Sequence, residues 1–275
     1  MSQQQAEGGR VRRLTESGLM LAFAFVLSKI PVIQMPFGGS VTAASMLPII
    51  LVAYRNGTRW GLFTGLAFAL LQLLREAQSL SFATSVVAGA AIIGLDYLAA
   101  FTLLGLGGLF RRCRRQTVGL LAGTLTVCVL RYLCHVITGC TVWAGVSIPS
   151  SDGLIYSLAY NAAYMVPETL LTVLAAGLLS RVLDFRAPTL RRADVGQMPA
   201  RARVCRALAG LLPAVAVAAD ALVLFAAIQT PDGFDITAIR TVSVGWLLGI
   251  AAAGALAGVI LYRLARRAEK NMEEN

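Results

Sequence analysis

Few residues of this 275-residue chain could take part in chemistry within its apolar segments, and they gather on three consecutive segments. These residues are Asp96 and Tyr97 in the first segment, Arg131, His135 and Trp143 in the second, and Tyr156, Asn161, Tyr164 and Glu168 in the third. A carboxylate, aromatic planes and amide or imidazole donors suit a flat, cationic, nitrogen-rich heterocycle. The residue types therefore predict a binding pocket for a molecule of this kind.

Helical spacing places these side chains at common depths. At 1.5 Å per residue, Asp96 and His135 both lie ~15 Å below the outer ends of their segments, and Asn161 lies at ~10 Å. Arg131 precedes His135 by one helical turn, and it reaches the same depth as Glu168, ~21 Å. We therefore expect one outward-facing pocket, with an ion pair between Arg131 and Glu168 as its floor.

Each of these residues also has a purely structural interpretation. A single His in a helix can be a packed polar residue with a satisfied hydrogen bond. Trp143 and Tyr156 lie near segment ends, where aromatic residues often form a belt at the membrane interface. Arg131 and Glu168 can be a structural ion pair. Asp96 is the hardest to explain in this way, since no obvious basic residue shares its depth.

The elements that position these residues are membrane helices. The chain is 57% hydrophobic and only 14% charged, with a mean hydropathy of +0.72, which excludes a cytosolic enzyme. A helix satisfies its own backbone polar groups in lipid, and the apolar runs lack the alternation of barrel strands. The predicted fold class is therefore an all-α integral membrane protein. Its apolar segments span residues 17–33, 41–54, 60–74, 84–110, 117–144, 154–183, 207–228 and 241–262.

Charge sets the expected topology. The net charge of +10 favours phospholipid headgroups over nucleic acid, because the Arg residues lie between the apolar runs. With a cytoplasmic N-terminus and a retained first helix, all but four of the 24 Lys and Arg residues fall on the inner side. We therefore expect a multi-pass protein of the cell membrane with both termini in the cytoplasm. The five cysteines show no C-x-x-C pair, so neither a disulfide framework nor a metal site is expected.

Composition also divides the chain. Residues 187–206 are rich in Arg, Pro and Ala and poor in large apolar residues, which is typical of a linker. This basic cytoplasmic linker separates a six-helix unit, residues 1–186, from a two-helix membrane tail, residues 207–275. The sequence assigns the tail no role.

Four strings carry a resemblance to a known family: MPFGGSVTAASMLPIILVAYRNGTRWGLFTGL (35–66), LDYLAAFTLLGLGG (95–108), RYLCHVITGCTVWAG (131–145) and YSLAYNAAYMVPE (156–168). Over about residues 14–184 the chain resembles the thiamine-specific S components, the ThiT family, of energy-coupling factor (ECF) transporters. The resemblance implies a six-helix S-component bundle that binds thiamine from outside, here with two additional C-terminal transmembrane helices. It also implies a T component and two ATPase subunits as partners that drive uptake, and no cofactor.

Matched position by position, the family's ligand contacts fall on Asp96, Tyr97, His135, Gly139, Trp143, Tyr156 and Asn161. Arg131, Tyr164 and Glu168 are expected to support the pocket. One member of the family has Glu and Lys where this chain has Asp96 and Arg131. The loop from Gln34 to Gly39 resembles the family's lid. Small residues at Ala24 and Ser28 stand where S components have a ridge that meets the T subunit, although such spacing, like the glycines at 105, 107 and 108, also suits close helix packing.

Two other functions stay open at this point. The same scaffold could bind a thiamine precursor or a different vitamin, which would not need a carboxylate at Asp96. A membrane-embedded enzyme would need a nucleophile, paired carboxylates or metal ligands at one depth, and the chain has one His and no H-E-x-x-H motif. The sequence contains no G-x-x-x-x-G-K-S/T motif, so any use of ATP must come from a partner.

Overall fold

The computed structural model describes residues 3–35, 39–83, 85–143, 150–193, 199–230 and 233–273, and these are mainly helical. The long helices are α1 Gln3–Ser28, α2 Leu47–Asn56, α3 Thr58–Arg75, α6 Gln116–Trp143, α7 Ser150–Val182, α8 Ala200–Ile228 and α9 Val244–Glu273. Between α3 and α6 lies a run of shorter pieces: α4 Val86–Ala91, the π-helical η2 Ile92–Ala99, α5 Ala100–Thr102 and the 3-10 helix η3 Leu103–Gly108. Each apolar segment predicted from the sequence lies mainly on helix.

The strands form three short antiparallel hairpins that connect helices. They are β1 Pro31–Gln34 with β2 Ser40–Thr42, β3 Leu183–Asp184 with β4 Arg191–Arg192, and β5 Gln229–Thr230 with β6 Gly233–Phe234. Two 3-10 turns, η1 Ala77–Phe82 and η4 Ile236–Thr241, complete the connections. The loop resembling a lid falls on the first hairpin, and its residues 36–38 lie outside the described part.

Five helical stretches in the described part are long and apolar enough to cross a membrane: Val86–Gly108, Gln116–Cys140, Gly153–Val182, Ala200–Ile228 and Val244–Asn271. The ten-residue α2 is ~15 Å long, about half of the hydrocarbon thickness. Its residues from Leu47 to Tyr54 are all buried, so it is covered by protein and not by lipid. Gly57, with φ at +95°, makes the sharp turn from α2 into α3.

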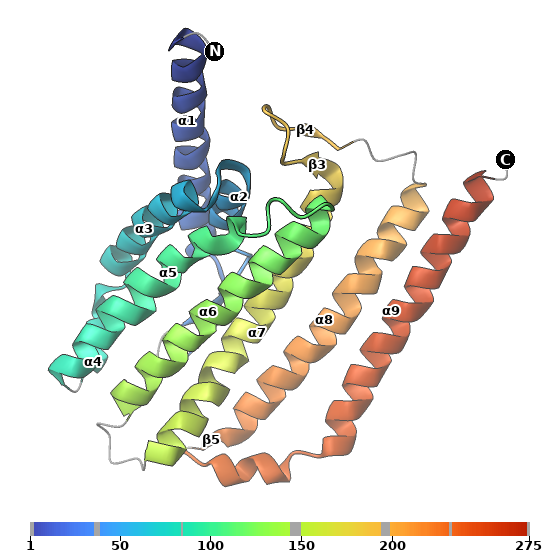
Figure 1. The fold of residues 1–275 in the computed structure, drawn as a ribbon. Coiled ribbons are helices and arrows are strands. Elements are labelled where there is room, and N and C mark those ends of the chain that lie inside the picture. Colours follow the sequence, from blue (N-terminus) through green and yellow to red (C-terminus); the bar gives the residue numbers. More distant parts are fainter. Residues whose placement is uncertain are drawn as a thin grey trace.

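The helices α6 to α9 run side by side, and α8 packs against both α7 and α9 (Figure 1). The marks for the two chain ends lie at the same end of the molecule (Figure 1). The arginines of the stretch 111–115 precede α6 at this end, whereas α3 and α6 finish at the other end.

Glycines allow the helices near the cavity to pack at close range. A Cβ at Gly105 would overlap the backbone of Leu62 in α3, and a Cβ at Gly108 would overlap the carbonyl of Ala53 in α2. A Cβ at Gly107 would press on Ile50. The prediction that these glycines serve close packing is confirmed.

The segment predicted as a linker contains regular structure. The β3–β4 hairpin begins at Leu183, and α8 begins at Ala200, seven residues before the predicted start of the tail. The backbone N–H of Arg186 donates to Asp184 Oδ1 at 3.0 Å, and the Arg191 guanidinium donates to Oδ2 at 3.0 Å. These contacts, that of Arg186 first, lower the pKa of Asp184 below its ordinary value.

Candidate functional site

A cavity of about 360 Å³ lies among α3, η1, η2, α6, α7 and the β2 strand. This volume is in the range of small-molecule sites. The residues predicted to bind or support a ligand that line the cavity are Asp96, Tyr97, Arg131, His135, Gly139, Asn161, Tyr164 and Glu168. Side chains expected at similar depths on three consecutive helices therefore line one cavity.

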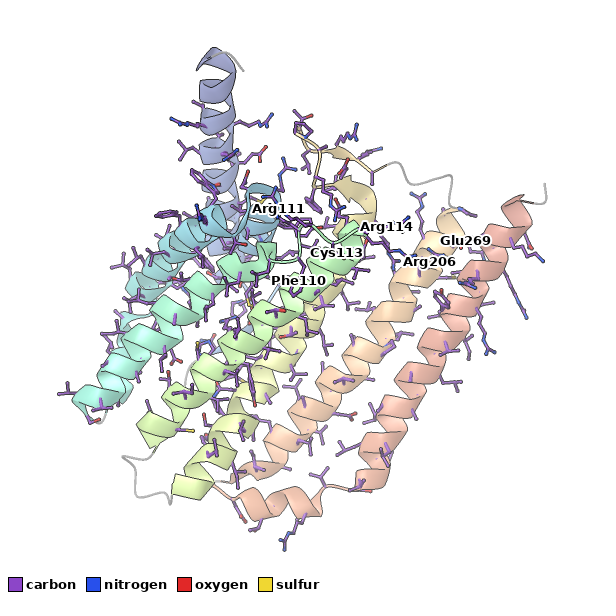
Figure 2. The ribbon with its side chains drawn as sticks, viewed as in Figure 1. Phe110, Arg111, Cys113, Arg114, Arg206 and Glu269 are labelled. Carbon is purple, nitrogen blue, oxygen red and sulfur yellow. The ribbon has the colours of Figure 1, made fainter. Side chains whose placement is uncertain are left out.

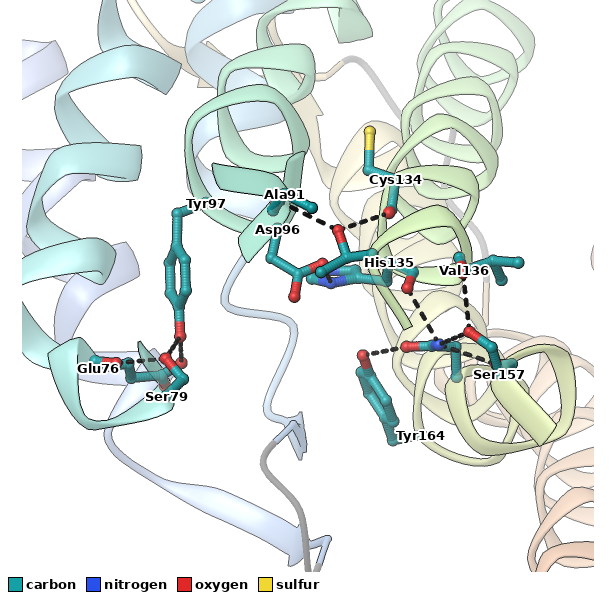
Figure 3. A network of polar contacts seen from close by, with 12 residues as sticks. Glu76, Ser79, Ala91, Asp96, Tyr97, Cys134, His135, Val136, Ser157 and Tyr164 are labelled. Carbon is teal, nitrogen blue, oxygen red and sulfur yellow. Dashed lines mark hydrogen bonds and ion pairs between the residues drawn. The ribbon is translucent and has the colours of Figure 1, made fainter. Parts of the chain in front are cut away.

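The π-helical η2 presents Asp96 and Tyr97 to the cavity from consecutive positions. Helical stretches of this kind are rare and are often found at functional sites. Asp96 Oδ1 lies 2.8 Å from Nδ1 of His135 on α6 (Figure 3). The other ring nitrogen of His135, Nε2, is buried and has no hydrogen-bond partner in the described part of the chain. The imidazole is thus anchored through one nitrogen and has no protein partner on the other.

Tyr97 extends toward the connection that follows α3 (Figure 3). Its hydroxyl donates to Glu76 Oε2 at 3.0 Å and lies 2.5 Å from Ser79 Oγ. Glu76 forms an ion pair with Arg75, and Arg75 Nη1 donates to the carbonyl of Ser28 at 3.3 Å. The end of α3 therefore supplies a second polar wall, opposite His135.

The ion pair predicted between Arg131 and Glu168 is present, with Nη1 and Oε2 3.2 Å apart. The Glu168 side chain is only 1% exposed. Its other oxygen accepts a hydrogen bond from the hydroxyl of Thr42 in β2, and the Arg131 guanidinium lies 4.6 Å from the centre of the Phe101 ring. Because buried charges need partners, these contacts hold both side chains in place.

Asn161 uses most of its hydrogen-bonding capacity within the protein. Its Nδ2 donates to the carbonyl of Ser157 at 2.8 Å and to the carbonyl of His135 at 3.3 Å. Its Oδ1 accepts from the hydroxyl of Tyr164 at 2.7 Å (Figure 3). A Cβ at Gly139 would collide with Ser157, so the glycine lets α6 and α7 approach. Asn161 thus joins the two helices and keeps one carbonyl lone pair for a ligand.

Of the predicted contacts whose side chains are described, Tyr156 does not line the cavity. Tyr156 is 2% exposed and packs in the interior, with its ring 5.7 Å from that of Tyr160. Tyr160, one turn later, lines the cavity instead, and its ring contacts Tyr164 at 6.0 Å and Phe225 of α8 at 5.4 Å. The side chain of Trp143 lies outside the described part, and its backbone ends α6 one turn beyond Gly139.

The charged side chains of the cavity sum to a net negative charge when His135 is neutral. Arg131 is paired with Glu168, and Arg75 is paired with Glu76. In the described part of the chain, Asp96 forms an ion-pair contact with the imidazole of His135 and with no Lys or Arg. The cavity is therefore electrostatically suited to a ligand with one positive charge.

Sequence reasoning missed the wall built by the end of α3. Gln72, Arg75 and Glu76 all line the cavity. Their spacing at i, i+3 and i+4 puts them on one helix face, which was the available signal. Gln72 lies inside the predicted apolar segment 60–74 and Arg75 and Glu76 directly follow it, and the serines of η1 beside them carry no pattern of their own.

The docking ridge predicted on α1 is wrong as placed. Ala24 is fully buried and Ser28 is 2% exposed. Ser28 Oγ donates to Gln72 Oε1 of α3 at 3.2 Å, and Ser28 lines the cavity. The small residues let α1 pack on α3 inside the chain, so they offer no surface to a second protein.

Comparison with known proteins gives consistent matches. A family model described as thiamine transporter protein matches residues 14–185. The chain is 35% identical over 194 residues to the thiamine transporter ThiT of Bacillus subtilis (strain 168), an alignment that covers 66% of this chain and 95% of that protein. It is 25% identical over 194 residues to the thiamine transporter ThiT of Lacticaseibacillus paracasei, covering 62% of this chain and 87% of that protein.

A solved structure, ThiT from Listeria monocytogenes, is similar with a TM-score of 0.50 and 22% sequence identity. The similarity covers 62% of this chain and 94% of that chain, and it shows a shared fold. The matched family region ends at residue 185, before α8 begins.

Proposed function

The chain belongs to the thiamine transporter protein (ThiT) family, and on that premise we propose that its cavity captures thiamine from outside the cell for uptake. The observation that carries this proposal is the Asp96 carboxylate, which in the described part of the cavity forms no ion pair with a Lys or Arg, whereas Glu76 and Glu168 each pair with an arginine. Thiamine has one permanent positive charge, on its thiazolium ring. A buried cation without a counter-charge would lose several kcal/mol on desolvation, so Asp96 is the expected partner of that ring.

The remaining contacts follow the geometry of the walls. Tyr97 and Tyr160 offer aromatic planes for flat rings. His135 Nε2 is positioned to hydrogen-bond the aminopyrimidine, and the family positions add Gly139, Asn161 and Trp143. Arg131, Tyr164 and Glu168 hold the ligand-contacting side chains in place from the floor of the cavity. Tyr156 acts in this proposal through its packing on Tyr160.

Orientation is proposed from charge and from the place of the cavity. Gly139 and Val142 line the cavity near the last turn of α6, whereas the basic stretch 111–115 precedes the first turn. Basic residues favour the cytoplasmic side. The cavity then opens outward, with both termini inside.

Uptake requires energy that this chain does not supply. We propose coupling to an ECF T component and two ATPase subunits, with docking on the exposed face of α1 in place of Ala24 and Ser28. On that face Gly18 and Ala22 are exposed small residues, followed by Val26, which is 53% exposed. Exposed small residues one turn apart allow another membrane helix to approach closely.

The docking face is tested by Ala22→Leu. In cells with the complete transporter we expect uptake to be lost while thiamine binding to the purified subunit is unchanged. Ala253→Leu, which adds the same bulk to an exposed position on α9, is the control. Full uptake with Ala22→Leu rejects this face.

The binding proposal is tested by titrating purified full-length protein with thiamine and with its neutral hydroxymethylpyrimidine portion. Trp60 donates to Ser17 at 2.8 Å, away from the cavity, and Trp246 is exposed on α9. The change in Trp fluorescence should therefore come from Trp143 and vanish in Trp143→Phe, while calorimetry still reports binding. Tighter binding of the neutral compound would favour the alternative, an S component for a precursor or another vitamin. Folded protein that binds neither compound overturns the assignment.

A further inference from the structure

A second groove lies between α8 and α9, and apart from Arg181 of α7 its lining residues follow the family-matched region. It offers about 970 Å³ and is lined at one end by five arginines and along its length by small and apolar residues. The arginines, called the arginine cluster below, are Arg181, Arg206, Arg263, Arg266 and Arg267. They come from three helices, α7, α8 and α9, at the end where the chain ends lie.

The arginine cluster carries more positive charge than the protein neutralises. Arg206 Nη2 lies 2.6 Å from Glu269 Oε2, and Figure 2 shows these two side chains meeting between α8 and α9. Arg266 lies over the Tyr262 ring at 5.5 Å. In the described part of the chain, Arg181, Arg263 and Arg267 are exposed and have no ion pair. Four positive charges therefore remain to be balanced by something outside the protein.

The other half of the groove is apolar and extends into the membrane-spanning part. Its floor is made by Gly210 and Pro213 of α8 and by Gly258 of α9. A Cβ at Gly258 would overlap Pro213, so the two helices approach closely there. From Ala255 to Arg267 the groove follows α9 for ~18 Å, which is the scale of a lipid acyl chain.

From this charge and shape we infer that the groove binds an anionic phospholipid, with its phosphate in the arginine cluster and an acyl chain along Gly210, Pro213 and Ala255. Basic pockets between membrane helices at the cytoplasmic surface suit anionic headgroups. A second copy of the chain would bring a second set of positive charges to the same place. The inference uses only the tail and the end of α7, so it stands independently of what the cavity binds.

The test is native mass spectrometry of the full chain in neutral detergent with added phosphatidylglycerol or phosphatidylcholine. We expect wild type to retain phosphatidylglycerol preferentially. R263Q/R267Q should weaken that retention by about tenfold, because each arginine near the surface contributes to the attraction of an anionic lipid. R112Q/R115Q removes the same charge from exposed positions before α6 and should leave retention unchanged.

A third variant separates a lipid from a free anion. Ala255 is exposed within the apolar half, so A255F fills the groove without disturbing the core. A255F should weaken the retention of phosphatidylglycerol, although it leaves the arginine cluster intact. Equal retention of the two lipids by wild type, or equal losses in R112Q/R115Q and R263Q/R267Q, overturns the inference. Displacement of the lipid by millimolar inorganic phosphate together with a silent A255F also overturns it, because the site would then be a phosphate site.

Discussion

The helices around the cavity and the two tail helices are both apolar, but they place their polar residues differently. In the most apolar stretches of α6 and α7, 44% and 39% of the residues are buried, against 17% in α8 and 11% in α9. The cavity region keeps the ion pair of Arg131 with Glu168 deep within the bundle. The tail keeps Arg206 with Glu269 at the end of its helices.

The difference indicates that the side chains of the two regions have different surroundings: mainly protein around the cavity, and mainly lipid around the tail. Around the cavity, the protein itself surrounds the charges and fixes their geometry, as a ligand site requires. In the tail, lipid surrounds most of the surface, and the charges lie where headgroups and water can reach them. Asp220 of α8 is the exception, because its Oδ1 is buried without a hydrogen-bond partner in the described part.

The largest effect should come from breaking the deep ion pair. Arg131→Met leaves Glu168 charged and buried, and we expect it to lower the free energy of unfolding by about 3–5 kcal/mol. Arg206→Met in the tail should lower it by about 1 kcal/mol or less, because its ion pair is about a quarter exposed on both sides. Unfolding by SDS in mixed micelles measures both.

The double variant Arg131→Met/Glu168→Leu is the internal control. It should recover most of the stability lost in Arg131→Met, because no unpaired charge remains. A double variant as unstable as the single one would mean that packing, and not charge, decides the cost. Equal costs of Arg131→Met and Arg206→Met would remove the distinction between the two regions.

The next effect concerns ligand charge. Asp96→Asn should weaken thiamine binding by about 2–3 kcal/mol, the scale of a hydrogen bond or contact to a charged group. Binding of the neutral hydroxymethylpyrimidine should change little. Asp184→Asn makes the same substitution in the β3–β4 hairpin and should change neither. Calorimetry with both ligands decides, and equal losses for the two ligands would reject Asp96 as the counter-charge.

The next variants remove hydrogen-bonding side chains that carry no permanent charge, and their effect on thiamine affinity should not exceed that of Asp96→Asn. His135→Ala and Asn161→Ala should each weaken thiamine binding by about 1–3 kcal/mol, since each leaves a polar partner unsatisfied. Thr124→Ala on α6 removes a hydroxyl that bonds only within its own helix, to the carbonyl of Leu120 at 2.9 Å, and serves as the control. Wild-type affinity in both cavity variants would place the site elsewhere.

Removing a carboxylate from the tail should raise the free energy of unfolding, whereas Arg131→Met should lower it. Asp220→Leu replaces an acidic residue in a membrane helix with an apolar one, and we expect the free energy of unfolding to rise by about 1–2 kcal/mol. The same measurement as for Arg131→Met applies. A loss of stability would show that Asp220 has a partner in the folded tail and that the tail, like the cavity region, depends on buried polar contacts.

The helices, and eight of the residues that line the cavity, could be predicted from the sequence for physical reasons. Apolar run length located the helices, and helical rise brought Asp96 level with His135 and Arg131 level with Glu168. The π-helical turn at Ile92–Ala99 has no comparable signal, because its spacing departs from the period that the pattern assumes.

Two features were harder to predict: which side of a helix faces the cavity, and which helix packs against a given surface. Tyr156 and Tyr160 lie one turn apart on one helical stripe, so helical spacing alone does not decide which of them reaches the cavity. Small residues at Ala24 and Ser28 suit either an internal or an external helix contact, and burial decided for the internal one. That the side chain of Trp143 contacts the ligand stays a prediction.

The smallest effect is expected from removing the tail. A chain that ends at Ala193, just after β4, keeps the whole family-matched region and the β3–β4 hairpin. We expect its thiamine affinity to change by no more than about twofold, and its thermal unfolding midpoint to fall only slightly.

The reason is that lipid can replace the tail where it covers the cavity region. The ring of Phe225 in α8 packs against the ring of Tyr160, with ring centres 5.4 Å apart, and this contact is apolar. When α8 is removed in a bilayer, lipid acyl chains of similar polarity take its place against Tyr160. The free energy of unfolding should therefore change little. Titration and thermal unfolding of the shortened chain in lipid nanodiscs test both statements. A shortened chain that unfolds normally but no longer binds thiamine would mean that α8 positions Tyr160, and that the cavity includes the tail in its function.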